Sequence, residues 1–152
     1  MTLSAANING VWFLSGAIDE TVDLKGLGVS APVVFNLANI TSINSMGIGE
    51  LVRFATDVGY ENITYAQCPP VFVNIFNTVS ALLKGSGKQS KVESIVVPFI
   101  CKKCDATSMS IVKIADIKIV SGSFDLPPKT CSRCQSELEA DFDPKEVFTF
   151  LT

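Results

Sequence analysis

The hydrophobic and polar positions alternate most regularly between residues 32 and 60. Residues 33–37 (VVFNL) form a nearly continuous apolar run, which is typical of a strand buried on both faces of a sheet. A short polar bend over residues 41–44 follows. From residue 45 to about residue 59, apolar side chains recur at helical spacing, which predicts an amphipathic helix. The residues predicted to line its buried face are Ile48, Leu51, Val52, Ala55 and Val58.

Similar patterns predict further elements on both sides of this unit. Residues 11–18 are expected to form a strand, preceded by a strand over residues 3–8 and an Asn-Gly hairpin turn. Residues 62–66 and 93–99 are expected to form two more strands, separated by an amphipathic helix over residues 70–84. Alternating strands and helices predict an α/β fold with right-handed crossovers.

Helical periodicity disappears after Pro98, so the α/β domain is expected to occupy residues 1–98. Residues 99–152 are expected to form a small β-rich module with an apolar tail that needs a surface to pack on. Its predicted strands lie at residues 110–114, 117–120 and 138–142. A module of this size with so few core positions needs a staple to be stable.

Four of the five cysteines form two Cys-x-x-Cys pairs, Cys101 with Cys104 and Cys131 with Cys134. Two residues between the cysteines let both sulfurs of a pair reach one tetrahedral ion at roughly 2.3 Å. Four thiolates leave no open coordination position, which is the pattern of a structural site. The sequence therefore predicts one structural Zn²⁺ in a zinc-ribbon-like module.

Two alternatives use the same cysteines: an iron ion, and redox disulfides without metal. Asp105 and Gln135 follow the two pairs at the position where glycine is commonest, because that position often requires a positive φ. Cys68 stands alone and is expected to be a small buried hydrophobe. The chain contains no histidine, which excludes Ser-His-Asp and Cys-His catalytic sites.

Composition narrows the class of protein further. Apolar residues make up 47% of the chain and charged residues 18%, which is ample for a core. The net charge of −3 argues against nucleic-acid binding as the main function. The N-terminal residues show no secretory signal pattern, and no apolar run is long enough to span a membrane. We expect a soluble cytoplasmic protein, and the oligomeric state stays open.

The start of the predicted helix at residue 45 is a candidate site. Asn44 is a good N-cap, so the first backbone N–H groups of the helix point toward Ser45. A helix N-terminus favours anions, and phosphate in particular. Glu50, Arg53 and Asp57 are predicted to lie on the solvated side of the same helix, where they can form a docking face with Ser45.

Three segments in this order resemble the STAS domain of bacterial anti-sigma factor antagonists: residues 14–19 (LSGAID), the strand at 33–37, and residues 43–48 (INSMGI) with their helix. The resemblance covers about residues 3–98. It implies a mixed β-sheet flanked by helices. The following segment, with its cysteine pairs, resembles a zinc ribbon appended to such domains.

The resemblance also implies a non-enzymatic role in signalling and transcription regulation. A STAS domain of this type binds an anti-sigma factor or a related serine kinase, and phosphorylation of one serine in an Asp-Ser-Ser/Thr-Gly motif releases it. Ser45 takes that serine's position here, with Asn44 and Met46 replacing the acidic residue and the second hydroxyl residue. The partner-binding residues implied are Asn44, Ser45, Met46, Gly47, Glu50, Arg53 and Asp57.

Two other functional classes remain open at this point. In one, the cysteine module binds nucleic acid or a transcription component through Lys102, Lys103 and Arg133, and the α/β domain is a scaffold. The acidic composition argues against this. In the other, the cysteine pairs serve a thiol-based redox enzyme, which would form disulfides reversibly without metal.

Overall fold

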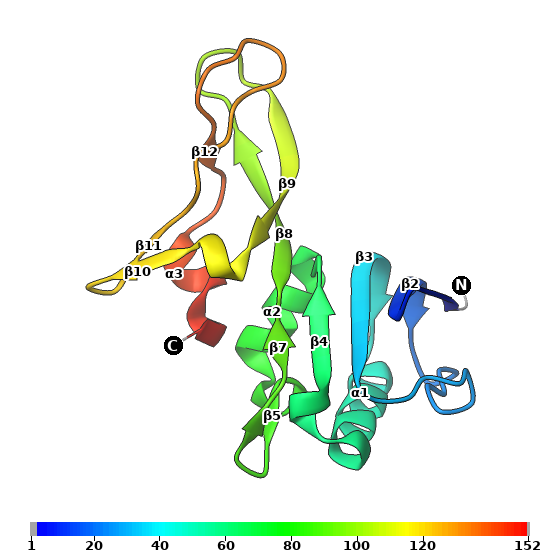
Figure 1. The fold of residues 1–152 in the computed structure, drawn as a ribbon. Helices are drawn as coiled ribbons and strands as arrows, with labels where there is room; N and C mark the ends of the chain where they lie inside the picture. The colour runs from blue at the N-terminus through cyan, green and yellow to red at the C-terminus, as the bar shows by residue number, and fades with distance from the viewer. Residues whose placement is uncertain (1–2, 152) are drawn as a thin grey trace.

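The structure, a computed structural model, describes residues 3–151 and contains a larger lobe built on a five-stranded sheet and a smaller β-rich lobe (Figure 1). The strands of the larger sheet, in spatial order, are β1 (Ser4–Ile8), β2 (Val11–Ile18), β3 (Val33–Ile43), β4 (Ile63–Ala66) and β7 (Lys91–Val92). β1 is antiparallel to β2, and every other neighbouring pair is parallel. The predicted mixed α/β arrangement is confirmed at this level.

Two helices cover the same face of this sheet. They are α1 (Ser45–Val58) and α2 (Pro70–Thr78). Phe35 and Tyr65 are paired across β3 and β4, so their side chains share one face. The ring of Phe54 on α1 lies 5.9 Å from that of Phe35, and the ring of Phe76 on α2 lies 5.5 Å from that of Tyr65. Both helices therefore pack on the face that carries the main core.

Two predictions need correction here: the end of the strand that leads into α1, and the set of residues that α1 buries. β3 extends to Ile43, because Ser42 and Ile43 pair with the end of β2, so the predicted bend shrinks to Asn44. On α1, Phe54 is buried together with Leu51 and Ala55. Ile48, Val52 and Val58, which were predicted to line the buried face, are only half-buried.

The predicted helix over residues 70–84 is also too long. α2 ends at Thr78, and a 3-10 turn, η2 (Ser80–Leu82), follows. The Tyr60 hydroxyl donates to the Ala81 carbonyl at 2.6 Å, and Leu82 is fully buried. These contacts hold the chain in a sharp turn that a continuous helix could not make. Between this turn and β7 lies the short hairpin of β5 (Lys84–Gly85) and β6 (Lys88–Gln89).

The smaller lobe grows out of the larger sheet through β8 (Ser94–Ile100), which begins two residues after β7 ends. An isolated bridge pairs Ile95 with Cys68, just beyond β4. β8 then pairs in antiparallel fashion with β9 (Thr107–Lys113) and β12 (Glu139–Ala140), in the order β12-β8-β9. The predicted domain boundary near Pro98 thus falls inside a strand that links the two lobes.

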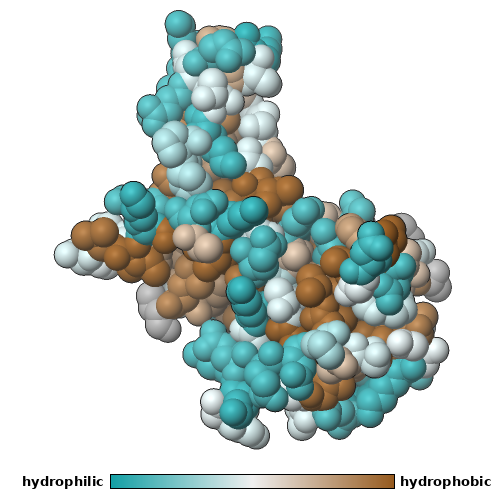
Figure 2. Space-filling model, in the orientation of Figure 1, coloured by the Kyte–Doolittle hydropathy of each residue, from teal (hydrophilic) through white to brown (hydrophobic). Residues whose placement is uncertain are grey.

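The rest of the smaller lobe consists of short elements. β10 (Lys118–Val120) and β11 (Ser123–Asp125) form a projecting hairpin, and Figure 2 shows hydrophobic surface over it. Its exposed apolar residues are Ile119 and Val120. The 3-10 turn η3 (Ile114–Asp116) joins β9 to β10. A further 3-10 turn, η1 (Tyr60–Asn62), belongs to the larger lobe, where it joins α1 to β4.

The C-terminal tail packs against α2, which supplies the surface that its apolar residues need. It contains α3 (Pro144–Val147) and the turn η4 (Thr149–Leu151). The Asn77 side chain on α2 donates to the Val147 carbonyl at 2.9 Å and accepts from the Phe150 N–H at 2.7 Å. Phe148 is fully buried. One hydrophobic core therefore continues from the larger sheet to the end of the described chain.

Candidate functional site

Each Cys-x-x-Cys pair forms a tight knuckle of the same construction. In the first, the Asp105 N–H donates to the Cys101 carbonyl at 2.8 Å. In the second, the Gln135 N–H donates to the Cys131 carbonyl at 3.0 Å. Asp105 has φ 59° and Gln135 has φ 65°, as predicted from their positions after the pairs. This left-handed backbone conformation turns the chain back at each knuckle, so that both of its sulfurs point inward.

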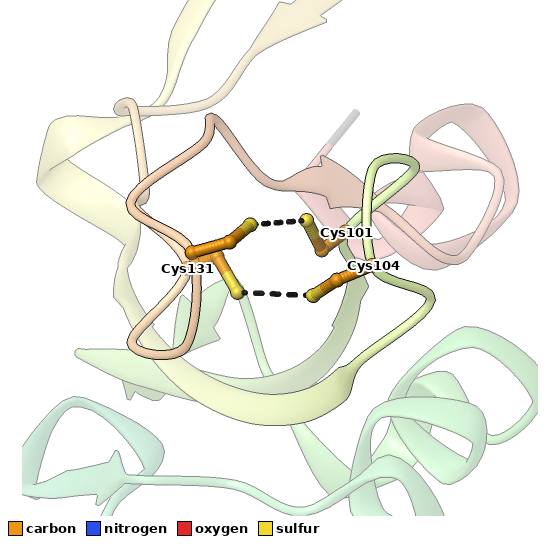
Figure 3. Close-up of side chains that lie close together, drawn as sticks. Cys101, Cys104 and Cys131 are labelled. Atoms are coloured by element: carbon orange, nitrogen blue, oxygen red, sulfur yellow. Dashed lines mark hydrogen bonds between the residues drawn. The ribbon is translucent and has the colours of Figure 1, made fainter.

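The two knuckles bring all four sulfurs together (Figure 3). The Sγ atoms of Cys101 and Cys134 are 3.4 Å apart, and those of Cys104 and Cys131 are 3.7 Å apart. All four lie within 4.8 Å of one another. Four sulfurs around one ion at roughly 2.3 Å would be separated by about 3.8 Å at tetrahedral angles. The cluster is of the right size to hold a metal ion.

The immediate surroundings lower the thiol pKa at two of the four positions. Hydrogen bonds from Ser136 lower the pKa of Cys134 to about 6. Backbone N–H groups of Cys134 and Arg133 lower the pKa of Cys131. For Cys104, a hydrogen bond from the Ala106 backbone lowers the pKa, but desolvation and the neighbouring thiols outweigh it and raise the value to about 11. Four crowded thiols cannot all ionise without a cation between them, and a bound metal ion would remove that conflict.

Cys68 plays no part in this cluster. It lies in the main core with no exposed surface, and burial raises the pKa of its thiol well above the usual range. The thiol is therefore held neutral, and the prediction of a small buried hydrophobe is confirmed.

The second candidate site is the start of α1, where Asn44 caps the helix and also bonds to the end of β2 and to Glu20. Its Oδ1 accepts from the Gly47 N–H at 2.8 Å, which confirms the predicted N-cap. Its backbone N–H donates to the Ile18 carbonyl at 3.2 Å, and its Nδ2 donates to Oε2 of Glu20 at 3.0 Å. The helix start is thus fixed to the end of β2. A carboxylate at position 44 would face that of Glu20, so the amide avoids a contact between like charges.

Gly47 allows α1 to approach β2 closely. A Cβ atom at this position would collide with the backbone carbonyl of Ile18. Gly47 is buried, so it supports the site and does not offer a contact surface. Ser45 and Met46, by contrast, are exposed, and 63% of Met46 is open to solvent. A hydroxyl and an apolar side chain are therefore exposed at neighbouring positions at the start of the helix.

Glu50 corrects the prediction of a solvated charged side. Its side chain is buried. The buried carboxylate is compensated there, because it accepts from the Leu24 N–H at 3.2 Å and pairs with Arg53. Arg53 and Asp57 are exposed as predicted. Lys25 pairs with Asp57 at 2.9 Å, and this contact lowers the pKa of the Asp57 carboxyl. The contacts of Leu24 and Lys25 come from the irregular β2–β3 connection, whose sequence carries no periodic signal.

A shallow hollow of about 370 Å³ lies beside Ser45. Its charged groups are three carboxylates and one guanidinium, and a hydrogen bond from Thr21 lowers the pKa of the Asp19 carboxyl. The lining residues are Asp19, Glu20, Val22, Ser45, Met46, Gly49, Glu50 and Arg53. The surface next to the hydroxyl is therefore acidic in balance.

Comparisons of this chain with protein-family models, curated proteins and solved structures gave no match. Within residues 3–151, no helix combines the length and apolar character required to cross a bilayer.

Proposed function

We propose that this protein is a non-enzymatic regulatory binding protein that recognises a protein partner through the exposed start of α1. The observation that carries this proposal is the placement of Ser45. It is an exposed hydroxyl on the first turn of a 14-residue helix whose N-terminus is tied to β2 by Asn44 and Gly47. A rigid, solvent-facing helix start of this kind suits recognition, because little ordering is needed on binding.

The proposed docking face consists of the exposed residues Ser45, Met46, Arg53 and Asp57, with Asn44 at its edge. Buried Gly47 and Glu50 hold this face in place: Gly47 allows the close approach to β2, and Glu50 anchors Arg53 and the Leu24 backbone. Met46 offers an apolar anchor within a charged surround, which is a common arrangement at protein–protein contacts. The STAS-like resemblance favours an anti-sigma factor or a serine kinase as the partner.

Phosphorylation of Ser45 would switch this face by charge. A phosphate adds up to about −2 at neutral pH, and the helix N-terminus tolerates it without unfolding. The same phosphate would lie beside Asp19 and Glu20, in a surface that is already acidic. A partner that fits the neutral hydroxyl would then meet a concentrated negative charge and dissociate.

The metal site has a structural role in this proposal, with zinc as the ion. The two knuckles belong to segments that are far apart in sequence, one following β8 and the other preceding β12. A closed set of four thiolates would hold them together without offering a position for a substrate. The lobe would then depend on the ion for its fold.

Capture from a lysate of the native host tests the docking face. Wild-type protein is compared with Ser45→Asp, Arg53→Ala and the matched control Ser80→Asp, which changes an exposed serine at the start of η2. We expect one protein to be captured by the wild type and by Ser80→Asp, and lost with Ser45→Asp and Arg53→Ala. Intact-mass analysis of the protein from its host would show a phosphate that disappears in Ser45→Ala.

The proposal fails if every protein captured by the wild type is captured equally by Ser45→Asp and Arg53→Ala. Circular dichroism of each variant serves as the folding control. Ser45 is exposed, so loss of capture without loss of helix would be an effect on recognition itself.

A second candidate function is favoured by the outer surface of the two knuckles. Lys102, Lys103 and Arg133 are all exposed there. This arrangement would allow contact with nucleic acid or a transcription component through phosphate groups. Asp105 and Glu137 lie in the same two loops and oppose it. Salt-dependent gel-shift binding that is lost when the three basic residues are changed would favour this function over docking through α1.

A further inference from the structure

β9 is an edge strand of the smaller sheet. Its seven residues, Thr107–Lys113, pair with β8 on one side only, and no strand among residues 3–151 pairs with the other side. In Figure 1, β9 runs along the outer side of the smaller lobe. A strand of this length with a free edge is a template for pairing with another strand.

The hydrogen bonds of the ladder decide which backbone groups point outward. The Ile114 N–H donates to the Glu93 carbonyl, and the Cys101 N–H donates to the Ala106 carbonyl. The backbone N–H and C=O groups of the even-numbered residues of β9 therefore point toward β8. In an antiparallel ladder those of the odd-numbered residues then point away from it. The outward groups belong to Thr107, Met109, Ile111 and Lys113. Consistent with this, the Ile111 carbonyl accepts from Nζ of Lys129 at 3.1 Å.

The side chains along this edge are unusually apolar for an exposed strand. Met109 is 53% exposed and Ile111 is 44% exposed, and both project from the same face of the sheet. Figure 2 shows hydrophobic surface at the base of the smaller lobe. Natural edge strands are protected by charges, prolines or bulges, and the only charged residue within β9 is Lys113, at its end. Lys129 is the one cation seen to occupy an outward carbonyl in the described ladder.

We propose that β9 pairs with β9 of a second copy of this chain, in antiparallel orientation about a two-fold axis at Ser110. In this register Met109 lies opposite Ile111 of the second copy. The outward N–H and C=O groups of each of these residues then bond to the C=O and N–H groups of the other. Thr107 lies opposite Lys113, so no like charges face each other. The pairing joins the two three-stranded sheets into one continuous sheet and covers the apolar side chains of both edges.

A second copy matches this edge in side chains as well as in backbone groups, because exposed Met109 and Ile111 meet each other and Lys113 meets the neutral Thr107. Any two-fold axis that passes through a residue of β9 brings outward groups opposite outward groups, whereas an axis between two residues does not. The axis at Ser110, the middle residue of Thr107–Lys113, is the one that matches the whole strand from end to end. Lys129 must leave the Ile111 carbonyl for the pairing to form, and its long side chain can do so without moving the backbone.

The first test is the solution mass of the full-length, metal-loaded protein by light scattering across micromolar concentrations. We expect a mass near twice the 16.3 kDa of one chain. Met109→Pro removes an outward N–H and leaves the β8–β9 ladder intact, and Ile111→Lys places a charge in the apolar pair. Each should raise the dimer dissociation constant roughly tenfold or more, because the two-fold axis applies every change twice. Ile119→Lys, at a similarly exposed position on β10, should leave the constant unchanged.

A cross-linking experiment tests the register itself. Position 110 is the only position of β9 that would lie opposite itself, in a non-hydrogen-bonded pair about 4.5 Å apart between Cα atoms. Ser110→Cys should therefore form a disulfide between two copies under mild oxidation, identified by peptide mass mapping. Ser108→Cys, which would lie opposite Val112, should not.

A monomeric wild-type protein at these concentrations would overturn the proposal. A dimer that survives Met109→Pro and Ile111→Lys, or that cross-links equally through positions 108 and 110, would overturn it as well. These results are independent of the α1 docking face, which no variant in this series changes.

Discussion

The two lobes of this molecule reach stability by different physical means. Among the largest fully buried side chains of the described residues, Phe148 alone comes from beyond residue 98. The larger lobe has a dense aromatic and aliphatic core, whereas the smaller lobe contributes few large buried side chains and carries a cluster of four cysteines. The larger lobe thus rests on hydrophobic burial, and under the proposed function the smaller lobe would depend on a bound metal ion in addition to its share of the core. The predictions below test this difference between the lobes.

Metal removal should have the largest effect and should be confined to the smaller lobe. Structural zinc sites contribute on the order of 10 kcal/mol to the folding of small modules. Chelation should therefore speed amide hydrogen exchange in β9 and β12 while β3 and β4 stay protected. Exchange that is unchanged in β9 after the metal has left would show that the ion is not a staple.

Truncation of a core side chain should have the opposite effect, because it should destabilise the larger lobe and leave the metal site intact. Phe35 is fully buried between Phe54 and Tyr65, so Phe35→Ala should destabilise the larger lobe by about 3–5 kcal/mol. Urea unfolding measures this, and the metal content should not change. Phe13→Ala is the control, because Phe13 is 37% exposed on the uncovered face of the same sheet. Equal losses in the two variants would contradict the assigned core.

A pair of glycines on α1 tests the close approach of the helix to β2. Gly47→Ala should destabilise the protein by about 1–3 kcal/mol, because the new methyl meets the Ile18 carbonyl. Gly49→Ala has open space around it and should stabilise the helix by up to about 1 kcal/mol. Thermal unfolding of the two variants should therefore shift in opposite directions, and shifts of the same sign would refute the packing described.

The smallest effect concerns the cap. Asn44→Ala should cost about 1 kcal/mol, because the Gly47 N–H loses its acceptor. Asn39→Ala, an exposed asparagine on β3, should change the free energy of unfolding by less than about 0.5 kcal/mol. Denaturant titration resolves this difference. An Asn44→Ala variant as stable as the control would mean that the cap contributes nothing.

The sequence predicted local features better than long-range ones. The Asn44 cap and the positive φ of Asp105 and Gln135 depend on residues a few positions away, and all three were predictable. The burial of Glu50 depends on a backbone N–H at Leu24, which periodicity cannot reveal. The end of α2 at Thr78 depends on Tyr60, which holds the following turn in place.

Prediction of the cysteine cluster and of the β9 edge from the sequence shows the same difference between local and long-range features. The spacing of the cysteines was sufficient to group them, because each knuckle is local and only its pairing is long-range. The role of β8 in both lobes, and the free edge of β9, arise from strand pairing. A hydrophobic pattern shows that a strand exists but not which strands lie beside it.

The most direct test of the difference between the lobes is elemental analysis of the purified protein, combined with a count of reactive thiols. We predict one zinc ion per chain in the wild type and in Cys68→Ala, and loss of zinc in Cys104→Ala. The four clustered thiols should react only after chelation. A wild-type protein that carries no metal, with those thiols free to react, would contradict the account.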